Sequence, residues 1–260
     1  MTAQHRIALG GLALMALGGC QTTPGADAGF LSRYDEMTPC RNSLRAAVRE
    51  RRDEVGAARI ERVFIEPAVV VGDAGAALAE EDRAAVLSEV DRQVCYELSE
   101  RFTILPTPHH EAARVRVGVA RITPTGQVSS AVSAAAAYFI PGPLDVRVPG
   151  TTGGLAAEAE LLEPATGDQI ASIVWARDAT VVGTDAPSLS RVGDALQLAE
   201  PFGDAVGDAF SPADRKPRPI AKPDPCAAFG PRFSPAEMAA GLVTGLYVPE
   251  LSGAMRRDPR

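Results

Sequence analysis

The sequence predicts an α+β domain in which two packed amphipathic helices lie against a mostly antiparallel sheet. Residues 82–102 carry apolar side chains at steps of three and four, the periodicity of a helix with one buried face. Residues 113–123 alternate apolar and charged side chains, which is typical of a strand. Two β-rich runs between residues 154 and 182 flank a turn that contains Gly167. The order of strand, helix, strands, hairpin and helix indicates an α+β layout.

The composition is that of a folded protein. Hydrophobic residues make up 46% of the 260 residues and charged residues 23%, so the chain can bury a core and general disorder is excluded. The net charge of −7 argues against a nucleic-acid-binding protein, which usually presents a basic face. No apolar run reaches the roughly 18 residues of a transmembrane helix, so none is predicted.

The N-terminus has the pattern of an export signal. His5 and Arg6 precede a short apolar stretch, so residues 1–19 are predicted to be a signal peptide. The stretch ends in Leu17-Gly18-Gly19-Cys20, which resembles a bacterial lipobox. Its small residues would let the peptidase reach the bond before Cys20, and the thiol would take the lipid. The alternative is a plain signal peptide with an incidental cysteine.

Lipidation at Cys20 predicts where the protein resides. Gln21 follows the cysteine, and a residue other than Asp there implies export to the outer membrane of a Gram-negative cell. Three acyl chains make a durable anchor, whereas a single chain binds only marginally. The acidic body has no attraction for anionic lipid, so the lipid has to be the anchor. We therefore expect a lipid-anchored protein at the periplasmic face of the outer membrane.

The first part of the mature chain is predicted to contain a tether, a surface helix and a strand. Residues 20–32 are small and polar, which indicates a lipidated tether. Residues 43–55 are densely charged and predict a helix on the surface. Residues 59–71 are rich in valine and isoleucine and predict a strand that Pro67 interrupts.

The two strongest patterns follow. Residues 82–102 predict the best-defined helix, and residues 102–105 predict a short strand that ends before Pro106. In residues 113–123 the apolar and basic side chains alternate, which predicts a strand with one buried face: Val115, Val117, Val119 and Ile122 against Arg114, Arg116 and Arg121.

A hairpin and a second helix complete a domain at residues 33–210. Residues 154–163 and 169–182 are the predicted hairpin strands. Residues 187–210 keep helical spacing through Pro201, which predicts one kinked helix or two helices that meet there.

Residues 211–260 are predicted to form a proline-rich tail with a short terminal helix. Six prolines within residues 211–231 indicate an extended, poorly packed segment. Ser234-Pro235-Ala236-Glu237 has the spacing of a capping box, so a short helix is predicted at 235–247, ended by Pro249.

Three cysteines remain after lipidation, in an oxidising compartment where a disulfide can persist. Cys95 lies in the predicted helix and Cys226 in the proline-rich tail, so a bridge between them would fasten the tail to the domain. A Cys40–Cys95 bridge and three unpaired thiols are the open alternatives. No C-x-x-C pair is present, so the cysteines do not predict a metal site.

Several short motifs resemble the domain-of-unknown-function 3313 family of bacterial lipoproteins. They are Gly29-Phe30-Leu31-Ser32-Arg33-Tyr34, Val63-Phe64-Ile65-Glu66-Pro67 and Ala157-Glu158-Ala159-Glu160-Leu161-Leu162 followed by Thr166-Gly167-Asp168. The resemblance covers residues 29–210, and the extra cysteines and the tail after residue 211 depart from it. It implies a location and a fold, and no activity.

The mature chain contains no group of residues that predicts a catalytic, cofactor or metal site. Its two histidines are the adjacent His109 and His110, whose side chains would point to opposite sides of an extended chain, so we expect a solvated loop. No G-x-S-x-G elbow, P-loop or G-x-G-x-x-G is present. Glu158 and Glu160 could form a carboxylate pair, but such pairs are common on solvated faces, where we expect them.

Residues 131–140 form an uncharged apolar run that ends before Pro141. The run predicts either a buried segment or an exposed docking patch with Tyr138, Phe139 and Ile140 as anchors. The predicted helix at 235–247 presents the same choice.

Together these observations predict a non-enzymatic outer-membrane lipoprotein that needs no cofactor. We expect it to bind another envelope protein, in envelope maintenance or as an accessory subunit, and to bind no nucleic acid. One alternative is a periplasmic binder of an apolar ligand or lipid, suggested by the small residues at 131–137. A less favoured alternative is an envelope hydrolase.

Overall fold

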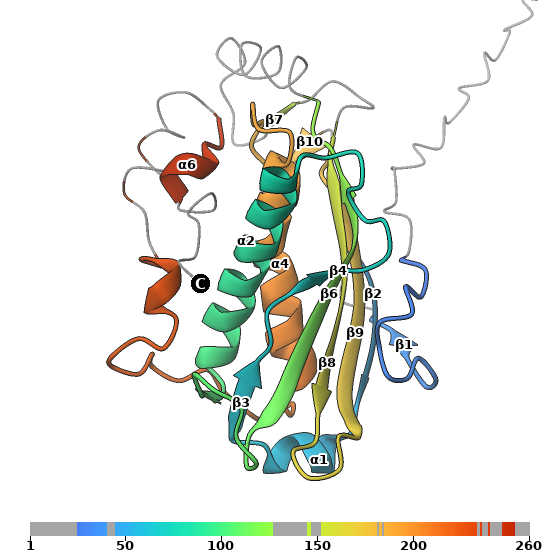
Figure 1. The fold of residues 1–260 in the computed structure, drawn as a ribbon, viewed down its shortest axis with the longest axis vertical. Helices are drawn as coiled ribbons and strands as arrows, with labels where there is room; N and C mark the ends of the chain where they lie inside the picture. Colours follow the sequence, from blue (N-terminus) through green and yellow to red (C-terminus); the bar gives the residue numbers. More distant parts are fainter. Residues whose placement is uncertain are drawn as a thin grey trace, which may run out of the picture.

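The chain folds into an α+β domain in which two long helices cover one face of a mixed, mostly antiparallel sheet (Figure 1). The structure is a computed structural model that describes residues 25–40, 45–126, 145–146, 152–180, 182–183, 185–232, 235, 239 and 246–252. This architecture confirms the predicted fold class.

The sheet has eight strands, and its path runs β1-β2-β9-β8-β6-β3-β5, with β4 paired to β6. Strands β3, β4, β5 and β6 pair in parallel, whereas the remaining neighbours are antiparallel. The strands are β1 (Thr38–Pro39), β2 (Ala47–Arg52), β3 (Arg62–Ile65), β4 (Val69–Val70), β5 (Thr103–Ile104), β6 (Ala113–Thr123), β8 (Gly154–Leu162) and β9 (Gln169–Asp178). A separate two-stranded sheet joins β7 (Asp145–Val146) to β10 (Val182–Gly183).

Strand β6 has the bounds and the buried face that its alternating sequence predicts. Val115, Val117 and Val119 are buried towards the helices. The register against β8 shifts between Val119 and Arg121, and this β-bulge lets Ile122 return to the buried face one residue late.

The β8–β9 hairpin forms the centre of the sheet, as its sequence predicts. The two strands pair antiparallel across a turn in which Gly167 has a φ of 74°, a conformation that favours glycine. All nine residues of β8 are buried, so this strand is covered on both faces. A strand that only one helical layer covered would expose every second side chain.

Two amphipathic helices form the second layer. Helix α2 (Glu80–Ser99) starts with three acidic residues, which suit the positive end of the helix dipole. Helix α4 (Gly193–Phe210) continues through Pro201, so the single-helix alternative is correct. Figure 1 shows the two helices side by side on the sheet. The ring of Phe202 on α4 lies 5.6 Å from that of Trp175 on β9, in the core.

The prediction of a surface helix at 43–55 was wrong. Residues of that segment form β2, which pairs with β9, and helix α1 (Glu54–Arg59) begins only after Asp53 caps it. Two arginines of β2 have partners outside the segment: Arg49 pairs with Asp27, and Arg51 donates to the carbonyl of Gln169. Charge density alone therefore did not indicate a helix.

The boundary of the predicted tether was also wrong. Residues 25–32 belong to the folded domain, because Leu31 is buried and the backbone of Ala28 and Ser32 bonds to side chains of β8. The domain therefore begins several residues earlier than residue 33.

The proline-rich segment after α4 is largely exposed, as predicted, but a disulfide fastens it to α2. Cys95 and Cys226 are bonded, with their Cα atoms 6.0 Å apart, and Cys40 is free and half-buried. A short 3₁₀ helix (Ala227–Phe229) follows the bridge.

Most of the predicted helix at 235–247 lies outside the described residues. Pro249 begins the four-residue helix α6 (Pro249–Ser252), where its missing N–H costs no hydrogen bond.

Replacing both bridged cysteines (Cys95→Ala with Cys226→Ala) is expected to lower the free energy of unfolding by about 2–4 kcal/mol, because the bridge restricts the unfolded chain. Cys40→Ala is the matched control and should leave stability nearly unchanged. Chemical denaturation of the oxidised protein measures both. Equal stability of the three proteins, or a mapped bridge that includes Cys40, would contradict this pairing.

Candidate functional site

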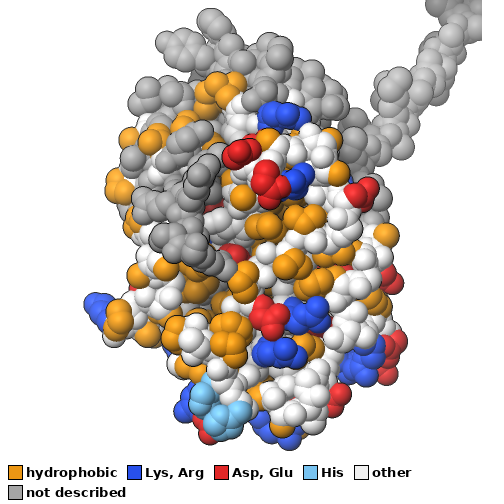
Figure 2. Space-filling model, in the orientation of Figure 1, with side chains coloured by type: hydrophobic (Ala, Val, Ile, Leu, Met, Phe, Trp, Pro, Cys, Tyr) orange, Lys and Arg blue, Asp and Glu red, His pale blue; other side chains and the backbone are white. Residues whose placement is uncertain are grey.

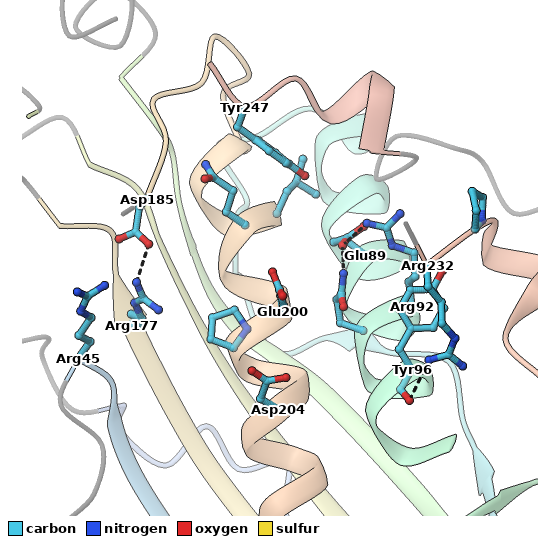
Figure 3. Close-up of a pocket in the computed structure, with 15 residues that line it drawn as sticks. Arg45, Glu89, Arg92, Tyr96, Arg177, Asp185, Glu200, Asp204, Arg232 and Tyr247 are labelled. Carbon is cyan, nitrogen blue, oxygen red and sulfur yellow. Dashed lines mark hydrogen bonds and ion pairs between the residues drawn. The ribbon is translucent and has the colours of Figure 1, made fainter. Parts of the chain in front are cut away.

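A polar cavity lies where α2, α4 and the C-terminal segment meet (Figure 3). Its volume is about 510 Å³, within the usual range of small-ligand sites. Glu89, Arg92 and Tyr96 come from α2, and Glu200 and Asp204 from α4. The other lining residues that the structure describes are Arg45, Gln93, Arg177, Asp185, Leu196, Gln197, Pro201, Pro231, Arg232 and Tyr247.

Two glycines on α4 let the two helices approach closely. A Cβ at Gly203 would lie 2.9 Å from the backbone carbonyl of Gln93, and one at Gly207 would lie 2.9 Å from Nε of Arg101. Larger residues at either position would push α4 away from α2. The glycines therefore set the width of the groove that carries the acidic side chains.

The close approach brings carboxyl groups of both helices together. Glu97 on α2 and Asp204 on α4 share a hydrogen bond. Burial, followed by the charge of Asp204, raises the pKa of Glu97 to about 7. Burial likewise raises the pKa of Asp204 and of Glu200, and the charge of Asp204 adds to the shift at Glu200. The groove thus holds acidic groups that repel one another.

Glu89 is the most deeply buried acid of the cavity, with 2% of its surface exposed. Its Oε1 accepts hydrogen bonds from Nη2 of Arg92 at 2.6 Å and Nε2 of Gln93 at 2.7 Å. Its Oε2 has no hydrogen-bond partner among the described residues. Burial raises the pKa of Glu89, and Arg92 opposes that shift.

The arginines of the cavity are bonded to partners within the chain. Arg177 donates to Asp185 at 2.6 Å. Arg232 donates to both carboxylate oxygens of Asp224 and also reaches the Tyr96 carbonyl. These ion pairs hold the arginine side chains in the cavity walls and offset the positive charge of the arginines.

A second buried acidic feature lies on the opposite face of the sheet. Glu158 accepts from the backbone N of Ala28 at 2.8 Å and from the Tyr34 hydroxyl at 2.5 Å. Glu160 accepts from the backbone N of Ser32 at 2.8 Å and from Nη1 of Arg116 at 2.6 Å. We call this arrangement, residues 28–34 held by Glu158 and Glu160, the N-terminal clamp.

The expectation that Glu158 and Glu160 lie on a solvated face was therefore wrong, because both are fully buried. Their strand is covered by the helices on one side and by the N-terminal segment on the other. Phe30 completes that cover next to Gly118, where a Cβ would lie only 2.7 Å from the Phe30 ring.

The family model described as "Protein of unknown function (DUF3313)" matches residues 26–206. The chain belongs to the DUF3313 family. The matched range starts just before the clamped residues 28–34 and ends on α4, so it includes the whole eight-stranded sheet, α2 and most of α4.

The solved structures that resemble this DUF3313 chain include two PelC dodecamers from Paraburkholderia phytofirmans. One is 11% identical with a TM-score of 0.38, and the other is 12% identical with a TM-score of 0.37. In each case the match covers 62% of this chain and 97% of the PelC chain. A comparison with curated proteins found no match.

Of the site residues that the sequence predicts for this DUF3313 protein, the structure describes Cys40, Cys95 and Cys226 and brings Cys95 and Cys226 together. Cys20 and the proposed docking anchors Tyr138, Phe139 and Ile140 lie outside the described residues. Cys95 and Cys226 form the bridge beside the cavity. In the described ranges no helix is long and apolar enough to cross a membrane, and no cluster of potential metal ligands occurs.

His109 and His110 lie in an exposed loop, as predicted. Figure 2 shows the histidine side chains at the surface, at the end of the molecule where β6 begins. On the same face, acidic and basic side chains lie next to one another among hydrophobic atoms, so no single charge dominates it.

Sequence reasoning missed the cavity altogether. A signal was present in the α4 sequence, because the small residues Gly203 and Gly207 are one turn apart and the acidic residues Glu200 and Asp204 follow the same spacing. This pattern indicates a helix that packs closely against a neighbour and carries acids at the edge of the contact.

Replacing Glu160 with alanine is expected to release the N-terminal segment. The substitution removes the acceptor for Ser32 and Arg116, and breaking such a buried pair should cost about 3 kcal/mol. Hydrogen exchange of residues 25–36 and chemical denaturation measure the two effects. Glu81→Ala, at an exposed position of α2, is the control and should change neither. Unchanged exchange in the Glu160→Ala protein would contradict the clamp.

Stability should fall as the pH rises from about 4.5 to about 7, because folded Glu97 holds its proton where the unfolded chain releases it. Glu97→Gln removes this proton linkage, so the variant should lose that part of the slope and gain up to about 3 kcal/mol at pH 8 relative to the parent. Denaturation curves across the pH range test this. An unchanged slope in Glu97→Gln would contradict it.

Proposed function

We propose that this DUF3313 protein is an exported lipoprotein, anchored through Cys20 to the periplasmic face of the outer membrane. Its α+β domain would act without catalysis, by binding another envelope protein in envelope maintenance or as an accessory subunit. The N-terminal clamp is the observation that carries the proposal, because it ties the lipid-bearing end of the chain directly to the sheet.

The clamp leaves only a short tether between Cys20 and the folded domain. Gly25 lies beside β9, where a Cβ on it would be 3.2 Å from Cγ1 of Val174, and its carbonyl accepts a hydrogen bond from Arg49 at 3.3 Å. The Cα atoms of Cys20 and Gly25 can therefore lie no more than about 18 Å apart, even with the intervening chain fully extended. A lipid on Cys20 would hold this part of the sheet close to the headgroups.

A short tether favours partners that lie in or on the same membrane. A domain on a long flexible linker samples a wide volume, whereas a domain fixed close to the bilayer meets membrane-bound partners at high effective concentration. This constraint supports a role as an accessory component at the membrane surface.

The alternative of an apolar-ligand carrier has less support. The cavity in the described part of the chain is lined mainly by charged and polar side chains, whereas apolar ligands require a predominantly hydrophobic lining.

Cys20→Ser is expected to abolish labelling with radioactive palmitate and to leave the protein soluble or unprocessed, because the acyl acceptor is lost. Cys40→Ser is the matched control and should retain both the label and the membrane fraction. Labelling and cell fractionation measure these outcomes. A Cys20→Ser protein that still takes up palmitate would contradict the anchor.

The Cys20→Ser and Cys40→Ser variants also test whether the protein binds a partner in the envelope. Crosslinking in intact cells should join the wild-type and Cys40→Ser proteins to the same envelope protein, and the product should diminish in Cys20→Ser. A protein that remains solitary while fully lipidated would contradict binding as its function.

A further inference from the structure

The cavity between α2 and α4 carries acidic groups that no basic residue neutralises by direct contact. Within the described part of the chain, neither lysine nor arginine donates a hydrogen bond to Glu200 or Asp204. The two side chains stand one turn apart on α4, and Figure 3 shows both at the cavity. Their carboxyl groups repel each other, since the charge of Asp204 acts directly on Glu200.

Glu89 adds a buried acceptor to the same wall. It is 2% exposed and it lines the cavity, yet its Oε2 has no partner among the described residues. An unpaired buried carboxylate oxygen destabilises the free protein, because it has lost its hydrogen bonds to water and gained none in return. The charge of Glu200 acts on Glu89 as well, and the charge of Arg92 opposes that repulsion at both residues.

Three of the four arginines that line the cavity are held by carboxylates, which disfavours an anionic ligand at them. Arg177 and Arg232 are bonded to Asp185 and Asp224, and Arg92 is bonded to Glu89. An anion that bound Arg92, Arg177 or Arg232 would have to displace one of these carboxylates while facing Glu200 and Asp204. A cation would instead relieve the repulsion and leave the ion pairs intact.

Aromatic groups line the cavity, and one of them already binds a guanidinium group of the chain itself. Tyr96 and Tyr247 line it from opposite sides (Figure 3). The ring of Tyr96 already attracts the guanidinium of Arg232, which lies 4.3 Å from the ring centre. Aromatic faces attract ammonium and guanidinium groups in general.

We propose that this cavity binds an organic cation, namely a molecule or side chain that carries ammonium or guanidinium groups. Glu200 and Asp204 contact the charged group, and Oε2 of Glu89 accepts one of its N–H bonds. The cation is supplied either by a free polyamine or by a lysine- or arginine-rich segment of a protein. This inference does not depend on lipidation at Cys20.

Isothermal titration calorimetry of the full-length protein in detergent solution tests the inference, with spermidine and the peptide acetyl-Lys-Lys-Lys-amide as the two probes. At least one probe should bind, and binding should weaken as salt rises. Binding of the peptide alone assigns the site to a basic protein segment, and binding of spermidine alone assigns it to a free polyamine.

Two double variants, each of which removes two negative charges, distinguish binding at the cavity from general attraction of a cation to an acidic protein. Glu200→Gln with Asp204→Asn should weaken binding about tenfold or more, because it neutralises the contacting groups. Asp73→Asn with Glu81→Gln changes exposed acids outside the cavity and should alter affinity less than about twofold. Thermal unfolding should show that both proteins are folded.

Glu200→Lys provides a second test, in which a positive charge is added to the cavity and binding of the probes is blocked. The new ammonium group would occupy the cavity from within, so this variant should bind neither probe and should be at least as stable as the parent. The inference is overturned if neither probe binds the wild-type protein, or if the cavity variant and the control variant bind equally well. Cys20→Ser protein should bind like the wild type, so failure of the anchor and failure of this site are distinguishable.

Discussion

Two buried carboxylates on the central strand dictate how the second face of the sheet is built. Glu158 and Glu160 are fully buried, and desolvation of such groups costs several kcal/mol unless donors surround them. The donors come from Ala28, Ser32 and Tyr34, more than a hundred residues earlier in the chain, and from Arg116 on the neighbouring strand. The N-terminal segment is therefore a third layer of the domain, and its position follows from the need to satisfy these acids.

On the opposite, helical face of the sheet, acidic groups of α2 and α4 lie close together without enough hydrogen-bond donors. Gly203 and Gly207 bring α4 so close to α2 that Glu97 and Asp204 share a hydrogen bond. Repulsion within such a group lowers stability at neutral pH, and perturbed acids in a cavity are typical of functional sites. The contrast between a satisfied acidic pair and an unsatisfied group is the physical reason for placing ligand binding at the helical face.

The C-terminal segment completes that site. Cys226 bonds it to Cys95 on α2, and Arg232 bonds to Asp224 and to the carbonyl of Tyr96. The bridge lies one residue before Tyr96, so it fixes the C-terminal wall against the helix that carries Glu89. The proposed membrane attachment and the cavity thus involve different parts of the chain, the N-terminal clamp for one and the C-terminal bridge for the other.

The sequence by itself determined the elements whose pattern is local. The alternation in β6, the helical spacing in α2 and the turn of the β8–β9 hairpin depend on neighbours within a few residues, so periodicity identified them. The family resemblance rested on residues 29–34, on residues 63–67 and on the β8–β9 hairpin, so it shares only the hairpin with these elements. The predicted helix at 43–55 was wrong because its charges are satisfied by the N-terminal segment and by β9, which local patterning cannot reveal.

Tertiary structure alone decided the features that join distant residues. It selected Cys95–Cys226 over the other cysteine alternatives, buried Glu158 and Glu160 on a strand covered on both faces, and brought Glu200 and Asp204 beside Glu89. Each outcome depends on which residues meet in the folded chain. The local sequence around a carboxylate is the same whether its hydrogen-bond donors are water molecules or a segment over a hundred residues away.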